Sequence, residues 1–223
     1  MTSRVSIPAM RPIAILVGVA STFLTFTVLG QGREFAVGAG YGHLFWDGSH
    51  TDTLAEQGGV RFEGRVSMPV TEPMTDARPE LRAGLGLGLA VYYSEHGGDV
   101  FEAGGIVFIE PEDFEQLTTL EPEIQLSLRV AVRHDLYIEP GVAGTLIVGN
   151  FRTGEDFVGF IDEDENRWRV GGGGRLILRG AYHRERWAFG VEGSYAYGWL
   201  DFGDDIGGDI QQGYIGLFYA HRF

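Results

Sequence analysis

The chain has 223 residues, including 35 glycines and no cysteine, and a formal net charge of −14 at pH 7. This length allows a single domain, and the missing cysteines exclude a disulfide framework or a thiolate metal site. All 17 basic residues are arginine, and the acidic residues gather between the apolar segments. Nucleic acid is therefore not an expected partner, because the exposed parts of the chain would repel phosphate.

The N-terminus has the layout of a secretory signal peptide. Arg4 and Arg11 precede an uncharged run of 17 residues at positions 13–29, and Val28 and Gly30 hold the −3 and −1 positions before Gln31. We expect residues 1–30 to form the signal peptide and residues 31–223 to form the barrel domain. An uncleaved membrane helix is the alternative, because the apolar run is at the lower end of spanning length.

Eight segments of the expected mature chain alternate between apolar residues and polar or small residues. A period of two predicts β-strands, and helical periodicity is absent after the N-terminal run. In chain order the segments lie at about residues 35–45, 60–68, 80–93, 123–133, 136–148, 167–179, 186–200 and 212–223.

The connections between these segments alternate in length. The odd-numbered connections, residues 46–58, 94–121, 149–166 and 200–210, are long and acidic, whereas the even-numbered ones are mostly short. Odd and even connections of an antiparallel meander lie at opposite ends, as in outer-membrane barrels with short periplasmic turns and longer external loops. Whether residues 94–121 form additional strands stays open, although the sequence G-G-I-V-F-I-E within them could do so.

The two faces of each strand predict which side contacts lipid. The polar face carries ten arginines, six glutamates and many glycines, as expected in a narrow lumen where charges must pair. The apolar face has aromatic residues near the strand ends, where the girdles of a membrane barrel lie. We therefore expect the apolar face to contact lipid. An exported soluble ligand-binding barrel, with the opposite polarity, is an alternative.

This assignment defines two sets of residues. The expected lumen charge network comprises Arg61, Glu63, Arg65, Arg82, Glu123, Arg129, Glu139, Arg169, Arg175 and Glu192. The expected aromatic girdle comprises Tyr93, Trp168, Trp187 and Trp199.

The signal layout, the eight strands, the long external loops and the terminal Phe223 together resemble the small outer-membrane β-barrel superfamily of OmpA-like and OmpW-like proteins. The resemblance covers the whole mature chain. It implies an all-β fold, an eight-stranded antiparallel up-and-down transmembrane β-barrel in contact with outer-membrane lipid. The last strand is similar to the signal that such proteins present to the barrel assembly machinery. In this chain that signal comprises Ile215, Leu217, Tyr219 and Phe223.

Two acidic connections are candidates for binding a divalent cation, since carboxylate oxygens are ligands for Ca²⁺ and Mg²⁺. The candidate residues are Asp162, Asp164, Asp204, Asp205 and Asp209. Neither segment has EF-hand spacing. A solvated, charge-repelling surface is the alternative interpretation.

No catalytic site and no cofactor are expected. Enzymes on this scaffold include lipid A deacylases, which would need a His-x-Ser pair on one side of a strand, and no strand has one. The G-G-G-G run at residues 171–174 is not followed by a helix or a lysine, so it is not a phosphate-binding loop.

The sequence thus predicts a structural or surface-interaction role, with acidic external loops above a charge-plugged lumen. Ten arginines against six glutamates leave an excess of positive charge in the lumen. A narrow channel or carrier for small solutes is therefore the alternative function, although eight strands leave little room beyond the side chains themselves.

Overall fold

The computed structural model describes residues 32–47, 56–72, 74–75, 78–96, 100–103, 106–109, 112–157, 160–203 and 206–223. The expected signal peptide lies outside these residues. Across the described ranges, no helix is long and apolar enough to cross a membrane.

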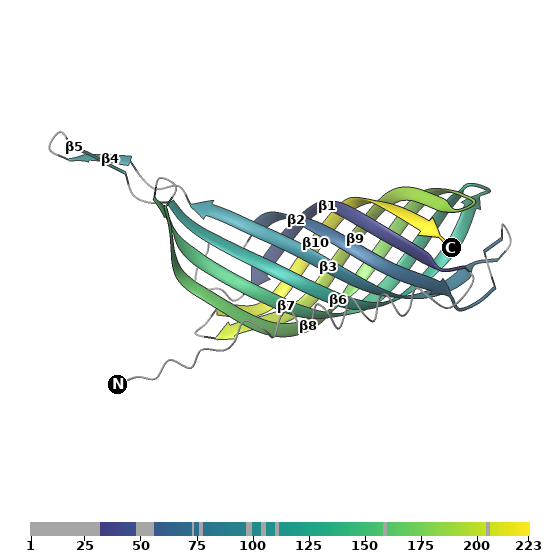
Figure 1. Cartoon of the computed structure of the whole chain (residues 1–223). Helices are drawn as coiled ribbons and strands as arrows, with labels where there is room; N and C mark the ends of the chain where they lie inside the picture. The colour runs from purple at the N-terminus through teal and green to yellow at the C-terminus, as the bar shows by residue number, and fades with distance from the viewer. Residues whose placement is uncertain are drawn as a thin grey trace.

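Eight strands form a closed antiparallel barrel, and two short strands form a separate hairpin (Figure 1). The barrel strands are β1 (Glu34–Asp47), β2 (Glu56–Pro69), β3 (Glu80–His96), β6 (Glu112–Arg133), β7 (Leu136–Phe157), β8 (Phe160–Arg184), β9 (Trp187–Gly203) and β10 (Ile206–Arg222). The hairpin strands are β4 (Val100–Ala103) and β5 (Ile106–Ile109). Around the barrel the order is β1-β10-β9-β8-β7-β6-β3-β2, so the prediction of an eight-stranded antiparallel barrel is confirmed.

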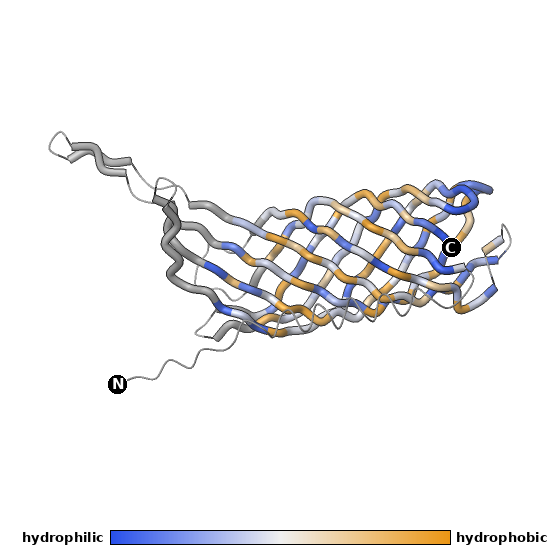
Figure 2. Tube along the Cα trace, viewed as in Figure 1, coloured by the Kyte–Doolittle hydropathy of each residue, from blue (hydrophilic) through white to orange (hydrophobic). Residues whose placement is uncertain are grey.

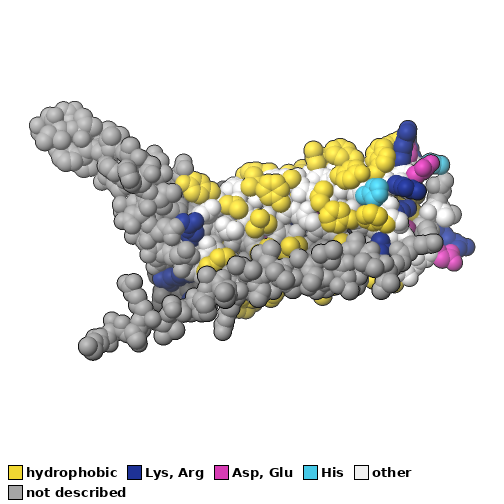
Figure 3. Space-filling view, in the orientation of Figure 1, with side chains coloured by type: hydrophobic (Ala, Val, Ile, Leu, Met, Phe, Trp, Pro, Cys, Tyr) yellow, Lys and Arg dark blue, Asp and Glu magenta, His cyan; other side chains and the backbone are white. Residues whose placement is uncertain are grey.

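The outer surface of the barrel is apolar. On β6, Ile124 is 70% exposed, whereas its neighbour Gln125 is only 7% exposed. The same alternation appears along the strands in Figure 2, and Figure 3 shows apolar side chains over the middle of the barrel, with charged side chains at its ends. Soluble monomers seldom expose contiguous apolar patches of more than a few hundred Å². The exposed band therefore fits contact with hydrocarbon, as the period-two pattern predicted.

Several strands are longer than the sequence indicated. β6 begins at Glu112, β7 ends at Phe157 and β8 begins at Phe160, so much of the predicted loops 94–121 and 149–166 is strand. The predicted loop 200–210 likewise lies mostly in β9 and β10. The open question about residues 94–121 is answered by the hairpin β4–β5, because β5 is the I-V-F-I of the quoted sequence.

The two ends of the barrel differ, and we call them the short-turn end and the extended end. The short-turn end has the β6–β7 turn at His134 and Asp135 and the β8–β9 turn at Glu185 and Arg186. The first described residues and the C-terminus also meet there, since the backbone N–H of Phe223 donates to Arg33 O at 2.8 Å. The extended end carries the long parts of β6, β7 and β8 (Figure 1).

Candidate functional site

The lumen holds a network of buried charged side chains, which we call the lumen charge network. Its four most enclosed arginines are only 1% exposed. These guanidinium groups are desolvated, so they need hydrogen-bond and ion-pair partners within the protein. The members are Glu34, Arg61, Glu63, Arg65, Glu80, Arg82, Glu121, Glu123, Arg129, Glu139, Arg175, Arg179 and Glu192. Nine of the ten residues expected from the sequence are among them, and Arg169 is the exception.

Glu121 is the centre of the part of the network nearer the extended end. Its carboxylate is fully buried and forms an ion pair with Arg61. It also accepts hydrogen bonds from Arg175 Nη2 at 2.5 Å, Thr119 Oγ1 at 2.7 Å and Gln212 Nε2 at 3.0 Å. The sequence analysis missed Glu121 because it was assigned to the third connection. Extending the alternation of β6 two residues upstream from Glu123 would have found it.

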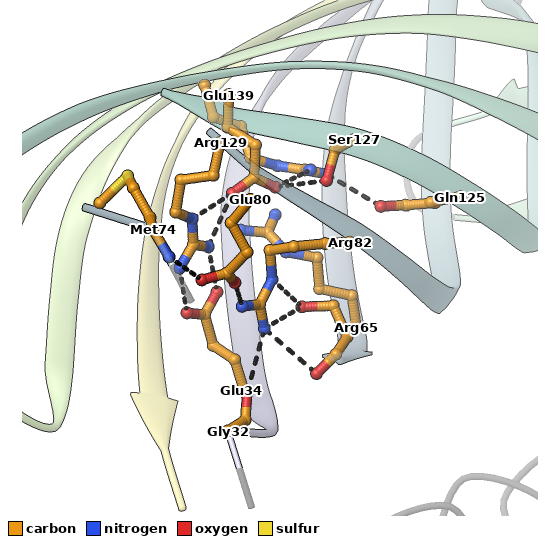
Figure 4. Close-up of polar contacts among 12 residues, drawn as sticks. Gly32, Glu34, Arg65, Met74, Glu80, Arg82, Gln125, Ser127, Arg129 and Glu139 are labelled. Atoms are coloured by element: carbon orange, nitrogen blue, oxygen red, sulfur yellow. Dashed lines mark hydrogen bonds and ion pairs between the residues drawn. The ribbon is translucent and has the colours of Figure 1, made fainter. Parts of the chain in front are cut away.

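Arg129 is the centre of the part nearer the short-turn end (Figure 4). Its Nη1 and Nη2 atoms donate to the two oxygens of Glu34 at 2.9 and 2.8 Å, and its Nε donates to Glu139 Oε2 at 2.7 Å. Arg179 continues the chain of contacts, with Nη1 3.1 Å from Glu139 Oε1 and Nε 2.5 Å from Glu192 Oε2. Arginine suits this role because its planar fork binds carboxylates through several donors at once.

Two clusters of buried apolar side chains pack in the lumen beside the lumen charge network. The cluster toward the extended end comprises Leu44, Ala90, Tyr92, Leu117, Ile147, Phe151, Leu200 and Ile210. The cluster toward the short-turn end comprises Ala36, Tyr137, Ala181, Ala188, Phe218 and Ala220, with Met74 packed against it. Met74 is held there by its backbone N–H, which donates to Glu80 Oε2 at 2.9 Å (Figure 4).

The sequence did not predict these clusters. Leu117 and Phe151 lie in predicted connections, and Leu200 lies at the boundary between a predicted strand and a predicted connection. The clusters matter because they fill part of the lumen beside the paired charges and leave less room for an ion.

The expected excess of positive charge in the lumen is wrong, because the described network contains seven glutamates and six arginines. Glu121 adds a carboxylate that the sequence analysis did not count. Arg133, Arg169 and Arg186 are exposed, and Arg167 is half-buried near the extended end. Net charge therefore gives no support for an anion pathway.

Arg169 lies at the rim of the barrel and not among the buried charges, contrary to the sequence-based expectation. It lies on the same side of β8 as Arg175, but six residues closer to the extended end, and its side chain is exposed. Its Nη1 donates to Trp168 O at 2.9 Å. The alternation of a strand identifies the face on which a side chain lies but not its depth in the barrel.

The predicted girdle and assembly-signal residues all lie on the outer surface. Tyr93, Trp168 and Trp199 are 42–54% exposed near the extended end, and Trp187 is 41% exposed at the short-turn end. Of the predicted signal residues, Ile215, Leu217 and Tyr219 form one exposed row on β10, and the exposed Phe223 directly follows the strand.

The candidate cation-binding residues are not on long loops where the structure describes them. Asp162 and Asp164 belong to β8, and Asp209 belongs to β10, where its Oδ2 accepts a hydrogen bond from Tyr197 OH at 2.5 Å. Asp204 and Asp205 lie outside the described residues. Within the described residues, no group of three His, Asp or Glu side chains could hold a metal ion.

The histidines whose side chains the structure describes do not form a catalytic arrangement with serine. His43 lies on the outer face, with Nδ1 3.5 Å from Tyr41 OH, and His134 and His183 lie at the short-turn end. In the described part of the chain, no hydrogen bond joins a histidine to a serine.

Comparison with known proteins supports the fold. No family model and no curated protein matches the chain. Among solved structures, the outer membrane protease OmpT from Escherichia coli is similar with a TM-score of 0.52 and 7% identity, over 86% of this chain and 97% of that chain. The chain has the fold of the small outer-membrane β-barrels.

Two further barrels are similar at lower scores. Neisserial surface protein A matches with a TM-score of 0.45 and 10% identity, over 86% of this chain and 97% of that chain. The attachment invasion locus protein Ail of Yersinia pestis matches with a TM-score of 0.43 and 11% identity, over 87% of this chain and all of that chain. At these identities neither likeness says anything about the activity of this chain.

Proposed function

We propose that this protein is a non-conducting β-barrel of the outer membrane with a structural or surface-interaction role. The observation that carries the proposal is the filled lumen, in which buried, paired charges pack beside apolar side chains. Eight strands give an interior just wide enough for side chains to fill. The alternative role as a channel or carrier would require solute to displace buried ion pairs, and the positive charge excess that suggested it is not present.

The extended end supports a role at the surface. Pairing between β8 and β9 begins at Gly172 and Trp199, whereas β8 stays paired with β7 as far as Phe160. Residues 160–171 are therefore paired on one side only in the described part of the chain. The strands here carry nine acidic residues, namely Glu112, Asp113, Glu115, Glu155, Asp156, Asp162, Glu163, Asp164 and Glu165.

This acidic sheet extension takes the place of the acidic loops that the sequence predicted. Because its negative charge is concentrated at one end, it would attract cationic partners and repel acidic ones.

Planar-bilayer conductance tests the sealed lumen. The refolded mature chain should insert and show no ohmic steps, with heat-modifiable migration on a gel as evidence that the barrel has closed. Regular conductance steps from the heat-modifiable species would instead support the channel. If the chain stays folded and monomeric in buffer without amphiphile, the soluble ligand-binding barrel is correct.

Cysteine labelling tests the orientation, and the absence of native cysteine makes single-site labelling clean. Glu163→Cys places the probe in the extended part of β8, and Glu72→Cys places it in the β2–β3 connection at the short-turn end. A membrane-impermeant maleimide should label Glu163→Cys on intact cells. It should label Glu72→Cys only after the outer membrane is permeabilised, and the reverse pattern would contradict the proposed orientation.

A further inference from the structure

The short-turn end has a hollow of about 840 Å³ at the tip of the β8–β9 hairpin, which we call the hairpin hollow. This volume is in the range of small-molecule sites. The residues that matter for its chemistry are Asp135, Tyr182, Arg184, Glu185, Arg186 and Trp187. No member of the lumen charge network lines it, although Glu34 and Arg129 line a small adjoining hollow on the lumen side.

Oppositely charged side chains line the hairpin hollow without forming ion pairs with one another. Arg184 and Arg186 face the same space as Asp135 and Glu185, yet within the described residues none of these four side chains forms an ion pair. At the same end, Arg78 and Glu72 do pair, with Arg78 Nη1 3.0 Å from Glu72 Oε2. Two cations and two anions held apart in one hollow are complementary to a ligand that carries both charges.

Arg184 is positioned by aromatic neighbours. Its Nε donates to Tyr182 OH at 2.8 Å, and its guanidinium carbon lies 6.0 Å from the centre of the Tyr182 ring. The Tyr182 ring in turn lies 5.8 Å from the Trp187 ring. The Nε contact fixes one side of the guanidinium, and its two terminal nitrogens stay available for a fork-like contact with phosphate.

The hairpin hollow lies at the edge of the apolar band. Trp187 is 41% exposed and begins the outward-facing row that continues through Phe189 and Val191. Figure 3 shows charged side chains at this end of the molecule, just beyond the apolar surface. Tryptophan at this position is typical of the lipid headgroup level in membrane barrels.

We propose that the hairpin hollow binds the headgroup of phosphatidylethanolamine, a phospholipid with one phosphate and one primary ammonium group. Arg184 and Arg186 hold the phosphate, Asp135 and Glu185 accept hydrogen bonds from the ammonium group, and Trp187 contacts the glycerol region. The balanced lining favours this zwitterion over an anionic lipid. The proposal rests on the proposed membrane location, with the short-turn end in the leaflet made of phospholipid.

Native mass spectrometry of the refolded mature barrel tests this site. Micelles contain equal amounts of phosphatidylethanolamine, phosphatidylglycerol and phosphatidylcholine with the same acyl chains. The wild-type barrel should retain phosphatidylethanolamine preferentially. Arg184→Gln/Arg186→Gln should weaken this retention about tenfold or more, as expected for the loss of hydrogen bonds to a charged group. Arg78→Gln, at the same end but outside the hollow, should not change it.

A second variant tests the ammonium contacts. Asp135→Asn/Glu185→Gln leaves the hollow with a positive charge, so its preference should move from phosphatidylethanolamine to phosphatidylglycerol. Equal retention of the three lipids by the wild type, or no change in either double variant, would overturn the headgroup site. Heat-modifiable migration is recorded for every variant. A barrel that closes but shows no lipid preference refutes this site alone, whereas failure to insert refutes the proposed function.

Discussion

Glu34 and Arg129 meet across the lumen through two nearly equal hydrogen bonds, at 2.9 and 2.8 Å. Glu34 is the first residue of β1 and Arg129 lies on β6, and these strands are not neighbours in the barrel. The pair therefore ties opposite parts of the wall together. It is bidentate, and both side chains are almost completely buried.

Breaking this pair should destabilise the barrel strongly. Glu34→Gln removes the negative charge but keeps the shape, so that among the described residues Glu139 is the one ion-pair partner left to Arg129. We expect the free energy of unfolding to fall by about 3–5 kcal/mol, as for other buried pairs that lose one member. Guanidinium unfolding in lipid vesicles measures it. Glu72→Gln, which breaks an exposed pair with Arg78, should cost less than about 1 kcal/mol.

Arg175 and Arg169 form a matched test of depth in the barrel. Both lie on the lumen side of β8, but Arg175 is 3% exposed and contacts Glu121, whereas Arg169 is exposed. Arg175→Gln should cost about 3–5 kcal/mol, because it leaves Glu121 with a single arginine. Arg169→Gln should stay within about 0.5 kcal/mol of wild type. Similar losses for both variants would contradict the assignment of Arg169 to the rim.

Two glycines in the G-G-G-G run should differ in their response to the same substitution. A Cβ atom on Gly171 would lie 1.9 Å from Trp199 O, a backbone atom that cannot move without shifting β9. A Cβ on Gly174 would meet Ala143 O at 3.7 Å, which is ordinary contact. Gly171→Ala should therefore destabilise by about 1–3 kcal/mol, whereas Gly174→Ala should be nearly neutral. Thermal midpoints from the heat-modified gel shift provide the comparison.

Arginine scanning along the outer face of β6 tests which side contacts lipid. Leu126 is 50% exposed in the middle part of the strand, and Val132 is 57% exposed beside the β6–β7 turn. Leu126→Arg should cost about 2–4 kcal/mol in a bilayer and Val132→Arg about 0–1 kcal/mol, because the penalty falls toward the interface. Equal costs, or no cost at either site, would argue against a membrane-spanning band. Unfolding titrations in vesicles measure both variants.

The lumen shows where sequence reasoning stopped short. The alternation of Ile124, Leu126 and Leu128 against Gln125 and Ser127 was enough to assign both faces of β6. Glu121 and Leu117 continue the same alternation, yet acidic residues around them suggested a loop. Their burial depends on contacts with residues of β2, β7, β8 and β10. The sequence pattern along one strand does not show which residues of other strands will lie against it.

The sequence by itself determined the architecture and its polarity, because side chains of a strand alternate strictly between two faces and only one of those faces is apolar in every segment. Only the tertiary structure decided which charges are sealed and with whom they pair. Depth in the barrel depends on how the strands are staggered around it, and contacts across the lumen join residues as far apart as Glu34 and Arg129. The stagger is set when the wall of the barrel closes. It therefore places Arg175 inside the lumen and Arg169 at the rim, although both residues follow the same pattern along β8.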